Sequence, residues 1–529
     1  MKSDSCFYIT RVTGLALVLA CGLALPGPAS ADWNQWRGPL RTGASPDHGP
    51  IADQWPETGP PLLWESGFIP SDHDGGHGSP VVADGRVYLG LVWHERVPSE
   101  QRVLDSEVLG ALQVAVPRFE EGVIESLERA RTEQAVRLRG DRLEAFIEQW
   151  MDEHLNEEQQ LQWSWWVVPR IRAGRTALSL EVIASLNSRR DHAFESVDEL
   201  RAWMTEEGFD AEVQNRVLQA VPATIKVAED TILCLDLEDG SELWRYTDAG
   251  EVTNRQASST PAVVDGRAYW SGSTGLICVD AATGEHLWSA PFAGSGPAAS
   301  PLVTGDAVVA LAGRLYAFDR VTGEMLWEQT DIRGNATSPV LWEDGGQTVI
   351  LCVSGRHVNA IDPADGQILW RVPGGNNSTP AVGPGHFAIL GQGDGFALRT
   401  YRAADGGGEP ELAWEQDWLT RRYQTTPLVH NGHVWLLGSG RHLCAEADSG
   451  SVRWQETRES TISSPALVDD KLLVLENNGT HLLMLAADPD EYRQLGRARV
   501  DAMWCPSPAV SDGRLVLRRR DSLVCFDLR

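Results

Sequence analysis

Basic, amide and aromatic residues recur in short polar segments between the apolar runs of this chain. They are Asn254, Arg255, Gln256, Arg333, Asn335, Asn376, Asn377, Arg421, Arg422, Tyr423 and Trp504. Guanidinium and amide groups that converge on one point form charge-assisted and bidentate hydrogen bonds with anionic or hydroxyl-rich ligands. If the fold brings these segments together, they predict a site for a small polar or anionic ligand. If it does not, the same groups serve the backbone of separate turns.

A second chemical candidate lies in residues 71–77, Ser-Asp-His-Asp-Gly-Gly-His. His73 and His77 are candidate metal ligands, because histidine and aspartate commonly bind divalent ions. The segment is rich in glycine and no third histidine is near it, so the alternative is local hydrogen bonding within a turn.

The strands that would position these residues are predicted by a repeated sequence pattern. Its clearest copy is residues 259–288, STPAVVDGRAYWSGSTGLICVDAATGEHLW. Four apolar or alternating runs are separated by Asp-Gly, a Gly/Ser cluster and Thr-Gly, which is typical of a four-stranded antiparallel meander. The proline that opens each unit recurs eight times. It stands at Pro80, Pro261, Pro301, Pro339, Pro380, Pro427, Pro465 and Pro508.

A tryptophan closes the fourth strand of most units, and we expect these residues to pack neighbouring units together. They are Trp64, Trp244, Trp288, Trp327, Trp370, Trp414 and Trp454. The last unit ends after its third strand, whereas residues 62–64 form a fourth strand with no unit before it. Pairing the two would hide both exposed edges. The sequence therefore predicts an all-β, eight-bladed β-propeller closed by its N-terminal strand.

The repeated Ser-Pro-x-Val-x-Asp-Gly-x-x-Tyr and Thr-Gly-x-x-Leu-Trp patterns resemble the pyrroloquinoline quinone (PQQ)-like repeat family, and residues 33–39 resemble the start of its secreted members. The resemblance implies the propeller fold, shared by quinoprotein dehydrogenases and a non-enzymatic outer-membrane assembly lipoprotein. It permits PQQ with calcium as cofactor, but the chain lacks the Cys-Cys pair and Cys-x-x-Cys-His motif of alcohol-oxidising members. A shared fold does not fix an activity.

The N-terminal residues predict export. Lys2 and Arg11 flank an apolar stretch that ends in Ala29-Ser-Ala31, which predicts a signal peptide over 1–31 and a periplasmic or extracellular protein. The alternative is a lipoprotein acylated at Cys21. No later stretch is apolar enough to span a membrane, and the formal net charge of −29 argues against nucleic acid as partner.

The first unit is interrupted by residues 95–225, whose apolar residues recur at helical spacing. We therefore predict an N-terminal extension over 32–60, a propeller over 61–94 and 226–529, and a helical insertion over 95–225. By topology the insertion rises on the face that carries the loops between blades. The function favoured by the sequence is a monomeric binding scaffold for a protein partner or a small ligand, and the alternative is a PQQ-dependent oxidoreductase acting on alcohols or sugars.

Overall fold

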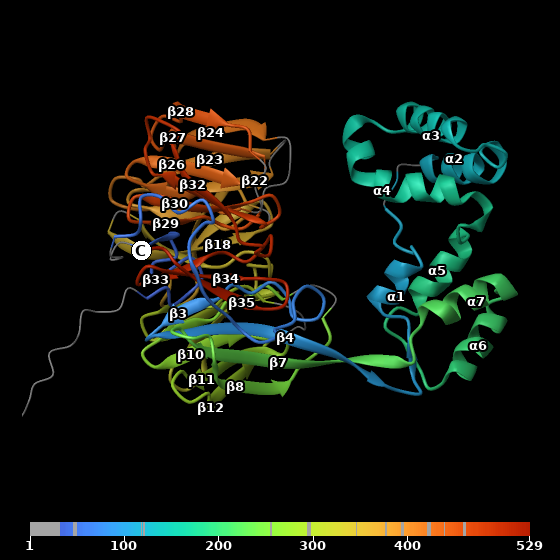
Figure 1. Cartoon of the computed structure of the whole chain (residues 1–529), viewed down its shortest axis with the longest axis horizontal. Helices are drawn as coiled ribbons and strands as arrows, with labels where there is room; N and C mark the ends of the chain where they lie inside the picture. The colour runs from blue at the N-terminus through green and yellow to red at the C-terminus, as the bar shows by residue number, and fades with distance from the viewer. Residues whose placement is uncertain are drawn as a thin grey trace, which may run out of the picture.

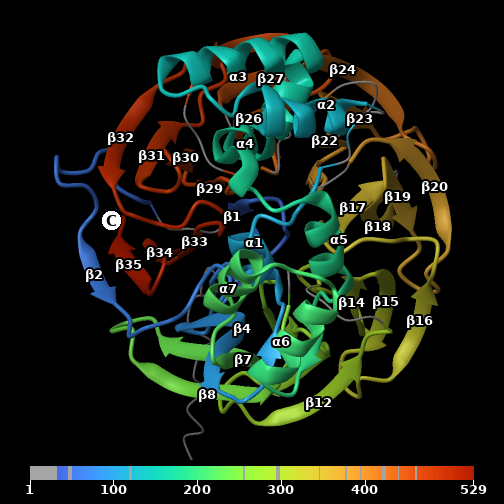
Figure 2. The ribbon, with the colours of Figure 1, turned by 90° about the vertical axis from the view of Figure 1, so that its right-hand side faces the viewer.

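Each proline-initiated unit folds into one antiparallel sheet, and the sheets are arranged in a ring in the computed structural model (Figures 1 and 2). The structure describes residues 32–45, 50–117, 119, 122–253, 257–293, 298–344, 346–375, 378–392, 396–419, 425–438, 440–458 and 462–529. The predicted signal peptide lies outside these residues.

The described residues contain eight four-stranded sheets, called blades here, one of which gains a fifth strand. In the first four blades the strands, from the axis outward, are β3 (Val81–Ala83), β4 (Arg86–Pro98), β7 (Thr224–Asp236) and β8 (Glu242–Ala249); β9 (Ala262–Val264), β10 (Arg267–Ser271), β11 (Gly275–Asp280) and β12 (His286–Pro291); β13 (Leu302–Thr304), β14 (Ala307–Ala312), β15 (Arg314–Asp319) and β16 (Met325–Gln329); β17 (Val340–Asp344), β18 (Gln347–Ser354), β19 (His357–Ile361) and β20 (Ile368–Pro373).

The remaining four blades follow the same order. Their strands are β21 (Ala381–Gly383), β22 (His386–Gln392), β23 (Phe396–Arg402) and β24 (Glu411–Leu419); β25 (Leu428–His430), β26 (His433–Gly438), β27 (Arg441–Glu446) and β28 (Val452–Glu456); β29 (Ala466–Val468), β30 (Lys471–Glu476), β31 (His481–Ala486) and β32 (Gln494–Arg499); β33 (Ala509–Ser511), β34 (Arg514–Arg518), β35 (Leu523–Asp527) and β2 (Leu62–Glu65). β2 pairs antiparallel with β35, so the strand before the first unit completes the last one.

The closing tryptophans join each blade to the next. Trp288 Nε1 donates to the Arg320 carbonyl at 3.3 Å, and a Cβ on Gly323 of that next blade would lie 2.7 Å from the Trp288 ring. In β32 the tryptophan position is held by Gly496, opposite Met484. The ring of Trp55, from the N-terminal extension, packs against Gly496 in its place.

The chain between β4 and β7 is mainly helical. It contains β5 (Arg102–Val103), α1 (Ser106–Ala111), α2 (Val123–Arg129), the π-helical η1 (Ala130–Gln134), α3 (Asp141–His154), α4 (Glu157–Ala173), the 3₁₀ turn η2 (Gly174–Thr176), α5 (Leu180–Ser188), β6 (Ala193–Phe194), α6 (Val197–Glu206) and α7 (Ala211–Ala220). These helices enclose two hydrophobic cores of their own, separate from those of the blades. Within the described part of the chain, no helix has the length and apolarity needed to cross a membrane.

β4 and β7 form a long hairpin that carries these helices away from the ring. They pair without interruption from Arg86 opposite Asp236 to Pro98 opposite Thr224, so the second strand extends four residues beyond the boundary that we predicted. Figure 1 shows the helices to one side of the disc, and Figure 2 shows them in front of it when viewed along the axis.

Candidate functional site

The serine or threonine that precedes each unit's proline lies next to the propeller axis. The residue before a proline is held extended, which orients its backbone N–H toward the equivalent residue of the next blade. Seven such bonds to a hydroxyl oxygen, of 2.9 to 3.3 Å, are present among the described residues. We call the eight residues the hydroxyl belt: Ser79, Thr260, Ser300, Ser338, Thr379, Thr426, Ser464 and Ser507. The bond from Ser507 to Ser79, at 2.9 Å, joins the last unit to the first.

The N-terminal extension fills the channel on one side of this belt. It enters beside the turn between β3 and β4, where Asp84 N donates to Asp32 Oδ1. Trp33 and Asn34 then form backbone hydrogen bonds with Val82 of β3 and Val263 of β9, the innermost strands of the first two blades. It returns as β1 (Ala44–Ser45), which adds a parallel strand to β29. We call residues 32–45 the plug, and Figure 2 shows β1 near the middle of the ring.

Two arginines of the plug bind the carbonyl groups of the unit prolines. Arg41 donates to the carbonyls of Pro301 and Pro339, the latter at 2.5 Å, and Arg37 donates to that of Pro427 at 2.6 Å. Each side chain is about 1% exposed. Among the described residues neither forms an ion pair, and Arg37 Nε and Nη1 have no hydrogen-bond partner. Burial lowers the pKa of both arginines to about 9, so both are still charged at pH 7.

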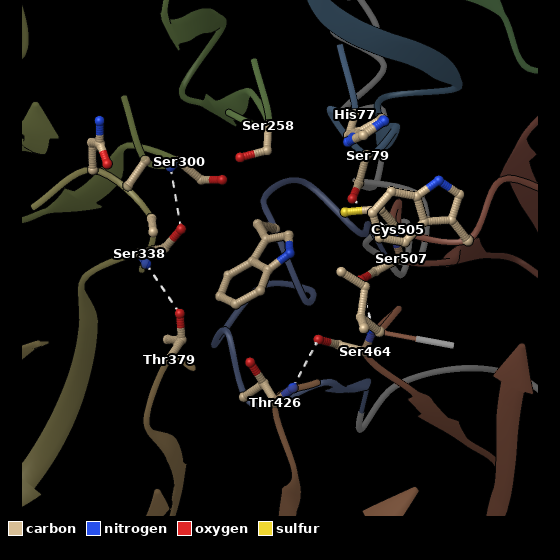
Figure 3. Close-up of a pocket in the computed structure, with 16 residues that line it drawn as sticks. His77, Ser79, Ser258, Ser300, Ser338, Thr379, Thr426, Ser464, Cys505 and Ser507 are labelled. Atoms are coloured by element: carbon tan, nitrogen blue, oxygen red, sulfur yellow. Dashed lines mark hydrogen bonds between the residues drawn. The ribbon is translucent and has the colours of Figure 1, made fainter. Parts of the chain in front are cut away.

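A cavity of about 490 Å³ lies on the other side of the belt. Seven of its sixteen described lining residues belong to the belt, and Figure 3 shows these residues facing a common space from several blades. The other described lining residues are Trp36 of the plug, His77, Ser258, Ala299, Asn335, Ala336, Ile462, Trp504 and Cys505. Because the plug occupies the channel beneath, the cavity is a blind pocket at the mouth of the ring.

The histidine in the wall is neutral near pH 7. His77 Nε2 lies 2.9 Å from Asp72 Oδ1, and its ring meets that of Trp504 edge to face at 5.1 Å between centroids. Burial lowers the pKa of His77, and the hydrogen bond that the ring donates to Asp72, with the charge of that carboxylate, only partly opposes this. The site therefore offers neutral hydrogen-bonding groups and two indole rings.

Of the sequence-predicted ligand residues, the structure places Asn335 and Trp504 at the cavity, whereas Arg333 is exposed and outside its lining. The other predicted ligand residues, at 254–256, 376, 377 and 421–423, lie outside the described residues. His77 reaches the cavity, but His73 lines a separate hollow near Lys226. No group of three metal-binding side chains occurs in the described part of the chain.

Sequence reasoning missed the plug arginines and the belt. Both had a visible signal: Ser or Thr stands before all eight unit prolines, and Arg37 and Arg41 follow closely on the Trp33–Trp36 segment. The arginines lie outside the repeat, so nothing in its period located them.

The comparisons bear on family as well as fold. A family model described as outer membrane protein assembly factor BamB matches residues 228–382 and 354–490. The chain belongs to the PQQ-like repeat β-propeller family. No curated protein matches this propeller.

Several solved structures resemble the propeller at low identity. BamB from Moraxella catarrhalis is 18% identical, with 56% of this chain and 89% of that chain covered and a TM-score of 0.46. The computationally designed Ika8 protein is 13% identical, with 57% and 93% covered and a TM-score of 0.41. A europium-containing methanol dehydrogenase is 12% identical, with 56% and 81% covered and a TM-score of 0.34.

The described cavity residues do not fit PQQ. The calcium that accompanies this cofactor needs carboxylate oxygens as ligands. Among the described lining residues there is no arginine, lysine, aspartate or glutamate.

Proposed function

We propose that this protein is an exported binding scaffold whose propeller mouth takes a small polar ligand. The observation that carries the proposal is the blind cavity on the axis, closed beneath by the plug and walled by hydroxyl groups from successive blades. A cavity of about 490 Å³ is within the size range of small-molecule sites. Hydroxyls would fix the ligand's orientation, and the indoles of Trp36 and Trp504 offer apolar contact area.

The predicted signal peptide supports export. The match to a family model described as an outer membrane protein assembly factor supports a binding role rather than a catalytic one. The PQQ-dependent oxidoreductase stays an alternative, tested by adding calcium and PQQ to the protein. A bound chromophore together with dye-linked oxidation of an alcohol or sugar would favour the oxidoreductase over the scaffold.

The test of the scaffold is a thermal-shift panel of neutral sugars, polyols, amino acids and sugar acids on the full chain. Binding to the folded state alone raises the melting temperature, by an amount that grows with the logarithm of the ligand concentration above its Kd. Ser258→Trp places a large ring in the cavity wall and should remove the shift. Ala282→Trp adds the same ring to an exposed turn on the opposite face and should keep it. A shift that survives Ser258→Trp would place the ligand elsewhere.

A protein partner on the helical insertion is a second candidate, supported by the tryptophans of α4. Trp163 and Trp166 are buried in the helical core, whereas Trp165 is 58% exposed. Exposed aromatic residues are common anchors of protein interfaces. If the insertion binds a partner, Trp165→Ser should abolish co-purification of that partner and leave the melting temperature unchanged.

A further inference from the structure

The hydroxyl belt presents donors, because its oxygens already accept hydrogen bonds. Ser300, Ser338 and Ser464 each accept a backbone N–H from the preceding blade. An accepting hydroxyl still has its own proton to donate. No acceptor for these three protons is present among the described residues, although each side chain is more than nine-tenths buried. The same holds for Thr379 and Ser507.

Thr426 adds a hydroxyl that, unlike those of the other five residues, accepts no backbone N–H among the described residues. Its backbone N–H donates to Ser464 Oγ at 3.3 Å, but its own Oγ1 has no hydrogen-bond partner among the described residues. The residue lines the cavity and is 1% exposed. Its hydroxyl can therefore be removed without breaking a described bond of the belt.

The two plug arginines lie directly beneath this set of donors. Arg41 binds the carbonyls of Pro301 and Pro339, which follow Ser300 and Ser338 in the chain, and Arg37 binds that of Pro427, which follows Thr426. Two buried guanidinium charges thus adjoin the cavity without a described carboxylate partner. Buried charges are normally paired, and a low-dielectric surrounding strengthens their field.

We infer that the mouth cavity binds the oxyanion of its ligand, a carboxylate, sulfate or phosphate group, through hydroxyl donors above two uncompensated plug arginines. This rests on the proposed function, and it narrows the ligand to one that carries such a group. The hydroxyls make the direct contacts, and the arginines act through the field from beneath the belt. Six hydroxyl donors with no competing described carboxylate in the wall match the acceptor-only character of an oxyanion.

The experiment is calorimetric titration of the full chain with glucuronate, with glucose as its neutral counterpart, and with inorganic phosphate. Glucuronate is expected to bind at least about tenfold more tightly than glucose, as a charge-assisted hydrogen bond predicts. Binding of phosphate as well would mean that a free oxyanion suffices, whereas binding of glucuronate alone would assign the oxyanion to a sugar acid. Glucose binding as tightly as glucuronate would overturn the inference and leave the proposed function standing. If neither glucuronate nor phosphate binds at millimolar concentration, the inference is wrong, and the thermal-shift panel decides the proposed function separately.

Matched variants separate the donors from the charges. Thr426→Val should weaken glucuronate binding about tenfold, whereas Thr426→Ser should retain it. Ser259→Ala is the control, because the Ser259 hydroxyl donates to the Ala299 carbonyl and is not part of the belt. Arg41→Met should weaken oxyanion binding and Arg41→Lys should restore most of it. If Arg41→Met does not fold, Thr426→Val decides, and unchanged binding in it contradicts the donor role.

Discussion

At the scale of single residues, packing between blades decides which of the repeated glycines is essential. Gly284 and Gly266 have nearly the same backbone conformation, with φ of +74° and +73°. A Cβ on Gly284 would lie 2.6 Å from the ring of Trp244, but one on Gly266 would meet nothing within 4 Å. A side chain would therefore cause similar backbone strain at both positions, but a steric clash only at Gly284.

Gly284→Ala should destabilise the protein more than Gly266→Ala. The strain of a non-glycine residue at positive φ costs about 1 kcal/mol in either variant. The forced displacement of Trp244 should add about 1 to 3 kcal/mol in Gly284→Ala alone. Chemical denaturation of both variants measures the difference, and equal losses would show that the tryptophan can move aside freely.

Buried histidines make the fold sensitive to acid. His442 in β27 is fully buried, and burial, with a smaller effect of the Arg458 charge, lowers its pKa to about 3. In the unfolded chain a histidine takes up its proton near pH 6.5. Between these pH values the unfolded state therefore binds more protons than the folded state. The contribution of His442 to stability is fully present above pH 6.5 and is lost as the pH falls toward 3.

The expected loss from His442 is on the order of 4 kcal/mol over that interval. His442→Leu should flatten the dependence of unfolding free energy on pH between 6.5 and 3. His357→Leu, at an exposed position of β19, serves as the control and should leave the slope as it is. A variant at 442 with the wild-type slope would contradict the assignment.

At the scale of elements, the β4–β7 hairpin separates two bodies with different duties. The helices have their own cores, and the hairpin is still paired at Pro98 and Thr224, where it joins the helices. Ion pairs from Lys226 Nζ to Glu107 at 2.6 Å and to Asp74 at 3.3 Å fix the base of α1 against the segment that enters the first blade. This predicts that the ring folds without the helices.

Replacing residues 99–223 with an Asn-Gly turn tests this independence. The turn suits a two-residue hairpin and would join strands that already face each other. The shortened chain should be soluble and keep the β-sheet signal and a melting temperature within a few degrees of the full chain. Loss of soluble protein would mean that the helices complete the core of the ring.

The repeat predicted the strands well because packing imposes its period on the sequence. The prolines, Asp-Gly turns and closing tryptophans are each required once per blade, so they recur at one spacing. The plug has no such constraint, since Arg37 and Arg41 each bind particular carbonyls once in the molecule. The same reason limits the prediction of the site. Asn335 and Trp504 line the cavity, but nothing in the local sequence distinguishes them from the exposed Arg333, and their role in binding stays a prediction.

At the scale of the whole molecule, stability depends on closure of the ring by the N-terminal segment. β2 supplies the outer strand of the last blade, and Trp64 Nε1 donates to the Leu237 carbonyl of the first blade at 2.8 Å. Glu65 adds bonds to Arg519 at 2.9 Å and to Ser522 at 2.7 Å. Without β2, the edge of β35 would be open to pairing with another chain.

Replacing residues 62–65 with Gly-Ser-Gly-Ser should therefore do two things while leaving the plug in place. It should lower the unfolding free energy by about 3 to 5 kcal/mol, the loss typical of removing a buried tryptophan. It should also produce dimers or larger species by pairing of the open edges, visible by size-exclusion chromatography. Trp64→Phe is the matched control, because it loses the Nε1 bond but keeps the strand, and it should elute at the same volume as the unaltered chain. If the replaced chain keeps the elution volume and the melting temperature of the unaltered chain, the hydrogen bonds of the hydroxyl belt are enough to close the ring, and the N-terminal strand only covers an edge that does not need it.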